Sequence, residues 1–193
     1  MDTPAPRIGV DYDSTLWPTY KVWQEISGNP LFDVQHIATW DDPVVYAGGL
    51  KAFEELNRQS LTYEAMNNHS PFPGCIDTLI QLEELGVHQS LITARAEADL
   101  EAVIRILQDH GYTPGIAVSR SGSGKVEYCL EHDISLLVED EPGTIRAAHE
   151  AGLLVASLRY RYNAAVIDEL SIPHAHDWSE LGPIIFQLLG LQP

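Results

Sequence analysis

Apolar residues recur along most of the chain in two alternating periods. From about residue 74 onward, runs with helical spacing alternate with short apolar runs that are typical of buried strands. The predicted helices span residues 76–85, 97–110, 126–132, 142–151 and 178–189, and the predicted strands span residues 90–93, 116–118, 135–138 and 153–158. This alternation predicts βαβ units, and therefore an α/β fold with a parallel sheet.

The segment from residue 17 to residue 73 does not continue the alternation. It follows a short apolar run at residues 8–10 and contains two helical candidates, residues 18–26 and 50–57, with scattered aromatic residues. Loops longer than about 15 residues are uncommon in compact domains. We therefore expect residues 17–73 to form a small, mainly helical cap inserted after the first strand, and residues 1–16 and 74–193 to form the core.

Composition and charge limit the classes of partner. The chain has 193 residues, of which 45% are hydrophobic and 20% charged, as expected for one globular core with a modest insertion. The net charge of −17 repels nucleic acid polymers and anionic membranes. A phosphorylated substrate would therefore need a local group of cationic side chains.

Cellular location and cysteine chemistry follow from two further observations. The first residues carry no basic start followed by an apolar stretch, and no apolar run reaches membrane-spanning length. We therefore expect a cytoplasmic protein. Cys75 and Cys129 lie in no metal-ligand spacing, and we expect both to be reduced thiols.

Two carboxylates stand where the first apolar run ends. Asp11 and Asp13 are two positions apart, so in an extended segment their side chains point to the same side. Two anions this close favour a bound cation, and oxygen ligands without Cys or His favour Mg²⁺ over Zn²⁺. The structural alternative is a strand followed by a turn, in which the aspartate side chains accept hydrogen bonds from nearby backbone amides.

Further polar residues follow three of the other predicted strands. Thr93 and Arg95 come after one strand, Lys125 begins a helix after a Ser/Gly loop, and residues 139–141 (Glu-Asp-Glu) follow another strand. Each of these residues alone fits a cap, a turn or a solvated surface. Because the carboxyl ends of parallel strands meet at one edge of a sheet, the set together predicts a ligand site.

These residues, in this order, resemble the motifs of the haloacid dehalogenase (HAD) superfamily of phosphotransferases. The resemblance covers most of the chain and implies a Rossmann-like, three-layer parallel core. The chain is most similar to the 5′(3′)-deoxyribonucleotidases and their relatives, on the segments Pro71-Phe72-Pro73-Gly74-Cys75, Leu91-Ile92-Thr93-Ala94-Arg95, Val138-Glu139-Asp140-Glu141-Pro142 and Tyr162-Asn163. It departs from that family where Glu139-Asp140 replaces the usual Asp-Asp pair and Glu141 replaces Arg.

The resemblance implies a role for each motif residue. Asp11 would be the nucleophile that forms an aspartyl-phosphate, and Asp13 the general acid and base. Mg²⁺ would be the cofactor, held by the Asp11 carboxylate, the Asp13 backbone carbonyl and Asp140. The phosphate oxygens would be bound by Thr93, by Lys125, and by backbone amides near Ser14 and Ala94.

Other candidate residues keep more than one reading. Glu139 would contact the water ligands of the metal, or be simply solvated. Arg95 would fix the loop after Thr93, contact the substrate, or form a surface ion pair. Trp17, Trp40 and Tyr46 would stack on a nucleobase or pack inside the cap, and packing is the commoner role of such residues.

The expected function is that of a Mg²⁺-dependent phosphomonoesterase acting on a small phosphorylated substrate, with nucleoside monophosphates as the favoured class. One alternative is the same chemistry on another phosphorylated metabolite. Another is an acidic binding module that kept the fold without turnover. Hydrolysis of phosphonates would need a cap lysine such as Lys21 or Lys51. We expect no nucleic acid or membrane partner, and leave a homodimer open.

Overall fold

The computed structural model describes residues 5–37 and 50–192. Within these residues, six parallel strands form one sheet in the order β3-β2-β1-β4-β5-β6. The strands are β1 (Arg7–Val10), β2 (His88–Thr93), β3 (Ile116–Ser119), β4 (Leu136–Val138), β5 (Leu154–Leu158) and β6 (His174–Ala175). The chain moves outward in both directions from β1, so the crevice for a ligand lies at the carboxyl ends of β1 and its two neighbours.

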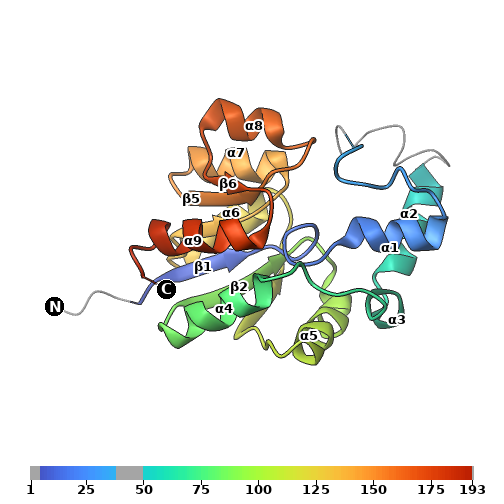
Figure 1. The fold of residues 1–193 in the computed structure, drawn as a ribbon, viewed down its shortest axis with the longest axis horizontal. Helices are drawn as coiled ribbons and strands as arrows, with labels where there is room; N and C mark the ends of the chain where they lie inside the picture. The colour runs from blue at the N-terminus through green and yellow to red at the C-terminus, as the bar shows by residue number, and fades with distance from the viewer. Residues whose placement is uncertain (1–4, 38–49, 193) are drawn as a thin grey trace.

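The helices of the described residues surround this sheet (Figure 1). They are α1 (Thr19–Ser27), α2 (Leu50–Ser60), α3 (Tyr63–Met66), α4 (Cys75–Glu84), α5 (Leu100–Asp109), α6 (Ser123–Glu131), α7 (Pro142–Glu150), α8 (Ala164–Leu170) and α9 (Trp178–Leu188). A short 3₁₀ helix, η1 (Glu97–Asp99), precedes α5.

Successive strand residues face opposite layers of helices. In β4, Leu136 and Val138 pack in the cluster that contains α4, α5 and α9, whereas Leu137 packs with α6, α7 and α8. This period of two places a helical layer on each face of the sheet. The predicted α/β fold, a three-layer Rossmann-like core with a parallel sheet, is therefore confirmed.

The middle of β1 has room only for glycine. A Cβ atom at Gly9 would lie 2.7 Å from Cδ1 of Ile92 and 3.1 Å from Cδ1 of Leu137. The isoleucine and leucine of the flanking strands thus fill the space in front of β1. This close packing fixes the level at which β1 ends and the candidate site begins.

Helices α1, α2 and α3 come from the segment between β1 and α4, and they lie beyond the carboxyl end of β1 (Figure 1). The two ends of this segment meet, because the Phe72 amide donates to the Leu16 carbonyl at 2.9 Å. The segment therefore leaves and re-enters the remainder of the chain at neighbouring points.

Several observed elements differ from the predicted ones. Helices α3 and α8 and strand β6 were not predicted, because they have four, seven and two residues and show too little periodicity. The predicted helix at residues 97–110 is divided into η1 and α5. The other predicted elements are present with ends shifted by up to a few residues.

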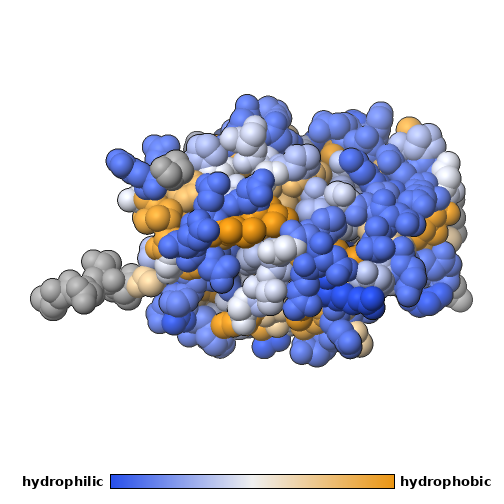
Figure 2. Space-filling view, turned by 60° about the horizontal axis from the view of Figure 1, so that its bottom comes forward, coloured by the Kyte–Doolittle hydropathy of each residue, from blue (hydrophilic) through white to orange (hydrophobic). Residues whose placement is uncertain are grey.

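Hydrophilic residues cover most of the face shown in Figure 2, and they separate the apolar side chains into patches. In the described part of the chain, no helix combines the length and apolar character needed to cross a membrane.

Candidate active site

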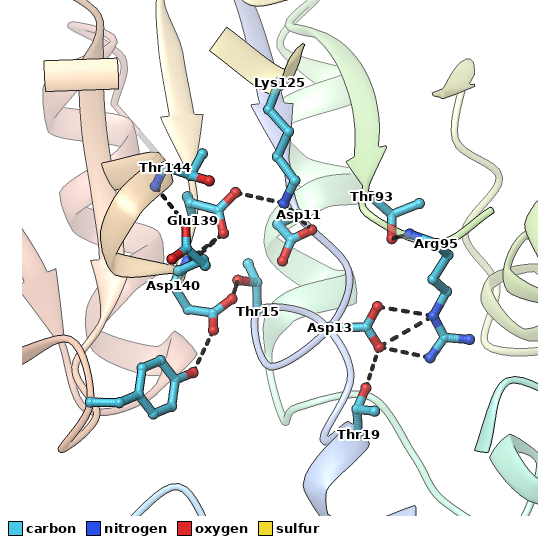
Figure 3. Close-up of polar contacts among 12 residues, drawn as sticks. Asp11, Asp13, Thr15, Thr19, Thr93, Arg95, Lys125, Glu139, Asp140 and Thr144 are labelled. Atoms are coloured by element: carbon cyan, nitrogen blue, oxygen red, sulfur yellow. Dashed lines mark hydrogen bonds and ion pairs between the residues drawn. The ribbon is translucent and has the colours of Figure 1, made fainter. Parts of the chain in front are cut away.

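Side chains from four separate segments converge at the carboxyl edge of the sheet (Figure 3). Asp11 follows β1, Arg95 follows β2, Lys125 lies in α6, and Glu139 and Asp140 follow β4. They line a pocket of about 730 Å³. The sheet edge therefore carries both of the anionic motifs and both of the cationic side chains that the sequence analysis singled out.

Lys125 forms the central ion pairs of this site. Its Nζ donates to Oδ1 of Asp11 and to Oε2 of Glu139, both at 2.7 Å, and the residue is 3% exposed. Burial alone would lower the pKa of the ammonium group, but the charges of Asp11 and Glu139 outweigh burial and raise it. Lys125 is therefore a fixed positive charge beside the predicted nucleophile.

Glu139 is fully buried, and both of its oxygens are engaged. Oε2 accepts from Lys125, and Oε1 accepts from the backbone amides of Asp140 and Glu141 at 3.1 and 3.0 Å. The reading of Glu139 as a solvated side chain is therefore wrong. The glutamate instead fixes the lysine and the first turn after β4.

Asp11 and Asp140 are crowded by other anions. Burial, followed by the charge of Glu139, raises the pKa of Asp11 well above its usual value, although Lys125 opposes this. The same two causes raise the pKa of Asp140 to about 7. Oδ1 of Asp140 accepts from the Thr15 hydroxyl at 2.9 Å, and Oδ2 accepts from the Tyr162 hydroxyl. Tyr162 thus holds Asp140, a role that sequence reasoning missed.

These carboxylates fit a divalent cation. Oxygens of Asp11, Glu139 and Asp140 lie within 4.8 Å of one another. A charged ammonium group and two amides donate to Glu139, whereas the donors to Asp140 are the neutral hydroxyls of Thr15 and Tyr162. Asp11 and Asp140 are therefore the better ligands. Burial and the charge of Glu139 raise the pKa of both groups, and a cation bound between them would oppose both effects. Hard oxygen donors suit Mg²⁺.

Asp13 lies on the other side of the pocket, in contact with Arg95. Nε and Nη2 of Arg95 donate to its carboxylate at 2.9 and 2.7 Å, and the Thr19 hydroxyl donates to Oδ1. Burial would raise the pKa of Asp13, but the charge and hydrogen bonds of Arg95, with that of Thr19, lower it overall. These contacts therefore favour the carboxylate form of Asp13 over the protonated form.

Arg95 is buried, so the reading of this residue as a surface ion pair is wrong. Its backbone is held as well as its side chain: the amide donates to Oγ1 of Thr93 at 3.2 Å, and the carbonyl accepts from the Ser119 hydroxyl at 2.6 Å. Arg95 thus joins the ends of β2 and β3 to the loop after β1.

The predicted phosphate-binding residues are only partly available. Ser14 and Ala94 line the pocket, and Thr93 is fully buried beneath it. Ser14 has a φ of 59°, its amide donates to the Trp17 carbonyl at 2.8 Å, and its carbonyl accepts from the Tyr160 hydroxyl. The turn itself therefore uses the Ser14 amide, and the binding of phosphate by amides near Ser14 stays a prediction.

Residues 17–73, the inserted segment, contribute aromatic side chains both to the core and to the wall of the pocket. Trp17 is fully buried and stacks on Tyr12 with ring centroids 5.9 Å apart, so it packs the core and does not contact substrate. Trp40 and Tyr46 lie outside the described residues. Four residues of the segment that sequence reasoning did not select line the pocket, namely Thr19, Trp23, Asn57 and Leu61. Helical spacing alone could not distinguish them from packing residues.

Comparisons with known proteins agree with this geometry. No family model matches the sequence. A curated protein from Bacillus cereus, named "Putative nucleotidase", is 27% identical over 119 residues, and this match covers 60% of the chain and 61% of that protein. The chain therefore matches less than two thirds of the length of this relative.

Solved structures match over a greater length. The structure of a HAD family hydrolase from Deinococcus radiodurans, with bound phosphate and sodium, matches with a TM-score of 0.69 at 17% identity. This match covers 100% of both chains. A haloacid dehalogenase-like hydrolase from Streptococcus pneumoniae has a TM-score of 0.63 at 14% identity, over 94% of this chain and 98% of that chain. The chain has the fold of the HAD-superfamily hydrolases.

Proposed function

We propose that this protein is a Mg²⁺-dependent phosphomonoester hydrolase that acts through an aspartyl-phosphate. The observation that carries the proposal is the meeting of Asp11, Lys125 and Asp140 at one buried point of the sheet edge. A carboxylate nucleophile needs nearby positive charge before an anionic phosphoryl group can approach it. Lys125 supplies part of that charge.

In the first step, one carboxylate oxygen of Asp11 attacks phosphorus, and the bond from phosphorus to the ester oxygen breaks. The leaving oxygen takes the proton of the protonated form of Asp13, so this step leaves Asp13 as a carboxylate. Lys125, held at 2.7 Å from Oδ1 of Asp11, orients the nucleophile and offsets the repulsion between the two anions. The products of this step are an alcohol and the aspartyl-phosphate.

In the second step, Asp13 accepts a proton from a water molecule that attacks the phosphorus of the aspartyl-phosphate. Inorganic phosphate leaves, and the Asp11 carboxylate is restored. The contacts of Arg95 and Thr19 favour the carboxylate form of Asp13, which is the form this step requires.

The metal-binding residues would be Asp11 and Asp140, together with the backbone carbonyl of Asp13. Bound Mg²⁺ supplies positive charge that neutralises phosphoryl oxygens. Thr15 and Tyr162 hold Asp140 in place by donating to its two oxygens. Glu139 accepts from the same ammonium group that contacts Asp11, and so helps to hold Lys125 beside the nucleophile.

We further propose that the substrate is a nucleoside monophosphate and that residues 17–73 act as a cap that selects it. The likeness to the Bacillus cereus protein supports this class. So does the presence of Trp23, Asn57 and Leu61 on the pocket wall, because an indole and an amide can contact a nucleobase by stacking and by hydrogen bonding.

The test is a panel of nucleoside monophosphates and sugar phosphates, assayed with Mg²⁺ and with a chelator. We expect hydrolysis of nucleoside monophosphates that needs Mg²⁺ and disappears in Asp11→Asn. The control is Asp77→Asn, which removes an equal charge from the exposed surface of α4 and should leave the rate unchanged. Activity confined to sugar phosphates would contradict the substrate class. Activity on none of the esters would favour a non-catalytic binding module.

A further inference from the structure

The guanidinium group of Arg95 connects Asp13 to the inserted segment. The Arg95 side chain is 2% exposed, and two of its nitrogens donate to the Asp13 carboxylate. Its third nitrogen, Nη1, lies 2.9 Å from the sulfur of Met66, which is fully buried in α3. Cζ lies 4.7 Å from the ring centroid of Tyr12. All three nitrogens and one face of this cation are thus in contact with protein groups.

Asp13 also contacts the other end of the inserted segment. Thr19 is the first residue of α1, and its hydroxyl donates to Oδ1 of Asp13. Met66 is the last residue of α3. The carboxylate therefore receives a donor from the start of the segment and, through Arg95, is joined to its end.

A guanidinium group is well suited to fix a carboxylate. Its donors lie in one plane, so paired contacts restrict both the position and the rotation of the partner. A base must lie within hydrogen-bond reach of the proton it takes, and a displacement of about 1 Å can reduce a rate by roughly a hundredfold. Arg95 itself transfers no proton, because it stays charged in proteins.

We propose that Arg95 is a positioning residue that holds Asp13 for the water step and ties this carboxylate to both ends of the inserted segment. This inference rests on the proposed hydrolase function, in which Asp13 takes a proton from water. Loss of Arg95 would slow hydrolysis of the aspartyl-phosphate. It would spare formation of the aspartyl-phosphate from an ester whose leaving group needs no proton.

The kinetic test uses p-nitrophenyl phosphate in rapid-mixing experiments with Arg95→Met and Arg95→Lys. In Arg95→Met we expect the steady-state rate to fall roughly tenfold to a hundredfold. A burst of about one equivalent of p-nitrophenolate per protein should precede the steady-state phase, because the covalent intermediate accumulates. KM should fall together with kcat. Arg95→Lys keeps the charge without the paired donors, and its steady-state rate should lie between those of the wild type and Arg95→Met. Arg120→Met, at an exposed arginine after β3, is the matched control.

A second measurement needs no turnover. Hydrogen exchange of the backbone amides should become faster in α1 and α3 of Arg95→Met, and remain unchanged in α7. Unchanged exchange in α1 and α3 overturns the proposed tie to the inserted segment. A lower steady-state rate without a burst overturns the positioning role, as does a raised KM at unchanged kcat. If the wild type hydrolyses no ester, the proposed function fails, and the exchange result still decides whether the tie exists.

Discussion

Replacing Lys125 by methionine tests the charge balance of the site most directly. Met fills nearly the same space, so little cavity is created and the main change is the loss of one positive charge. That charge makes two contacts of 2.7 Å, with side chains of Asp11 and Glu139 that are 7% and 0% exposed. Removing one partner of a buried ion pair costs about 3–5 kcal/mol, because the remaining charge is left uncompensated.

The assay is urea unfolding in the presence of a chelator. For a slope of about 1–3 kcal/mol per molar urea, such a loss lowers the midpoint by at least about 1 M. Lys21→Met, at an exposed lysine of α1, is the control and should change the midpoint little. Activity should be lost as well, because the repulsion between nucleophile and phosphate is no longer offset.

A double variant tests whether the loss arises from charge and not from shape. Glu139→Gln retains an oxygen that can accept from the amides of Asp140 and Glu141, and it removes one buried negative charge. In the Lys125→Met background it should therefore restore about 1–2 kcal/mol of the lost stability. A single Lys125→Met variant with an unchanged midpoint, or a double variant less stable than that single variant, would refute the reasoning.

Two further predictions concern the core. Gly9→Ala should destabilise the protein by about 1–3 kcal/mol, because the added methyl lies 2.7 Å from an isoleucine methyl; Gly115→Ala, which meets no atom within 4 Å, should be near neutral in the same thermal melts. Burial raises the pKa of the Cys75 and Cys129 thiols to about 12, so at pH 8 both should react with thiol reagents only after denaturation. Rapid labelling of the native protein would contradict this.

Much of the fold could be predicted because its main elements are long and periodic. The alternation of short apolar runs with helical repeats predicted the parallel sheet, and the ends of those runs located the site at Asp11, Thr93, Lys125 and Asp140. Helix α8 and strand β6 were not predicted, since so few residues carry no clear period.

Contacts between distant side chains could not be predicted in the same way. Arg95 and Asp13 are 82 positions apart, and nothing in their spacing indicates that they meet. Glu139 resembled a solvated acid because the neighbouring residues are also acidic, whereas its partners come from α6 and from its own turn. For Trp17, the sequence left nucleobase stacking and packing as alternatives and favoured packing, and its burial confirms packing.

The hydrogen bond from the Phe72 amide to the Leu16 carbonyl has a consequence for evolution and for protein engineering. Because the exit and return points are already joined, parts of the intervening stretch that spare the contacts of Thr19 and Met66 could be exchanged or lengthened without moving the strands. Doubling the length of a flexible loop costs only about 0.6 kcal/mol in closure entropy. The proposed hydrolytic centre could thus acquire new selectivities by replacing a single contiguous piece of the gene.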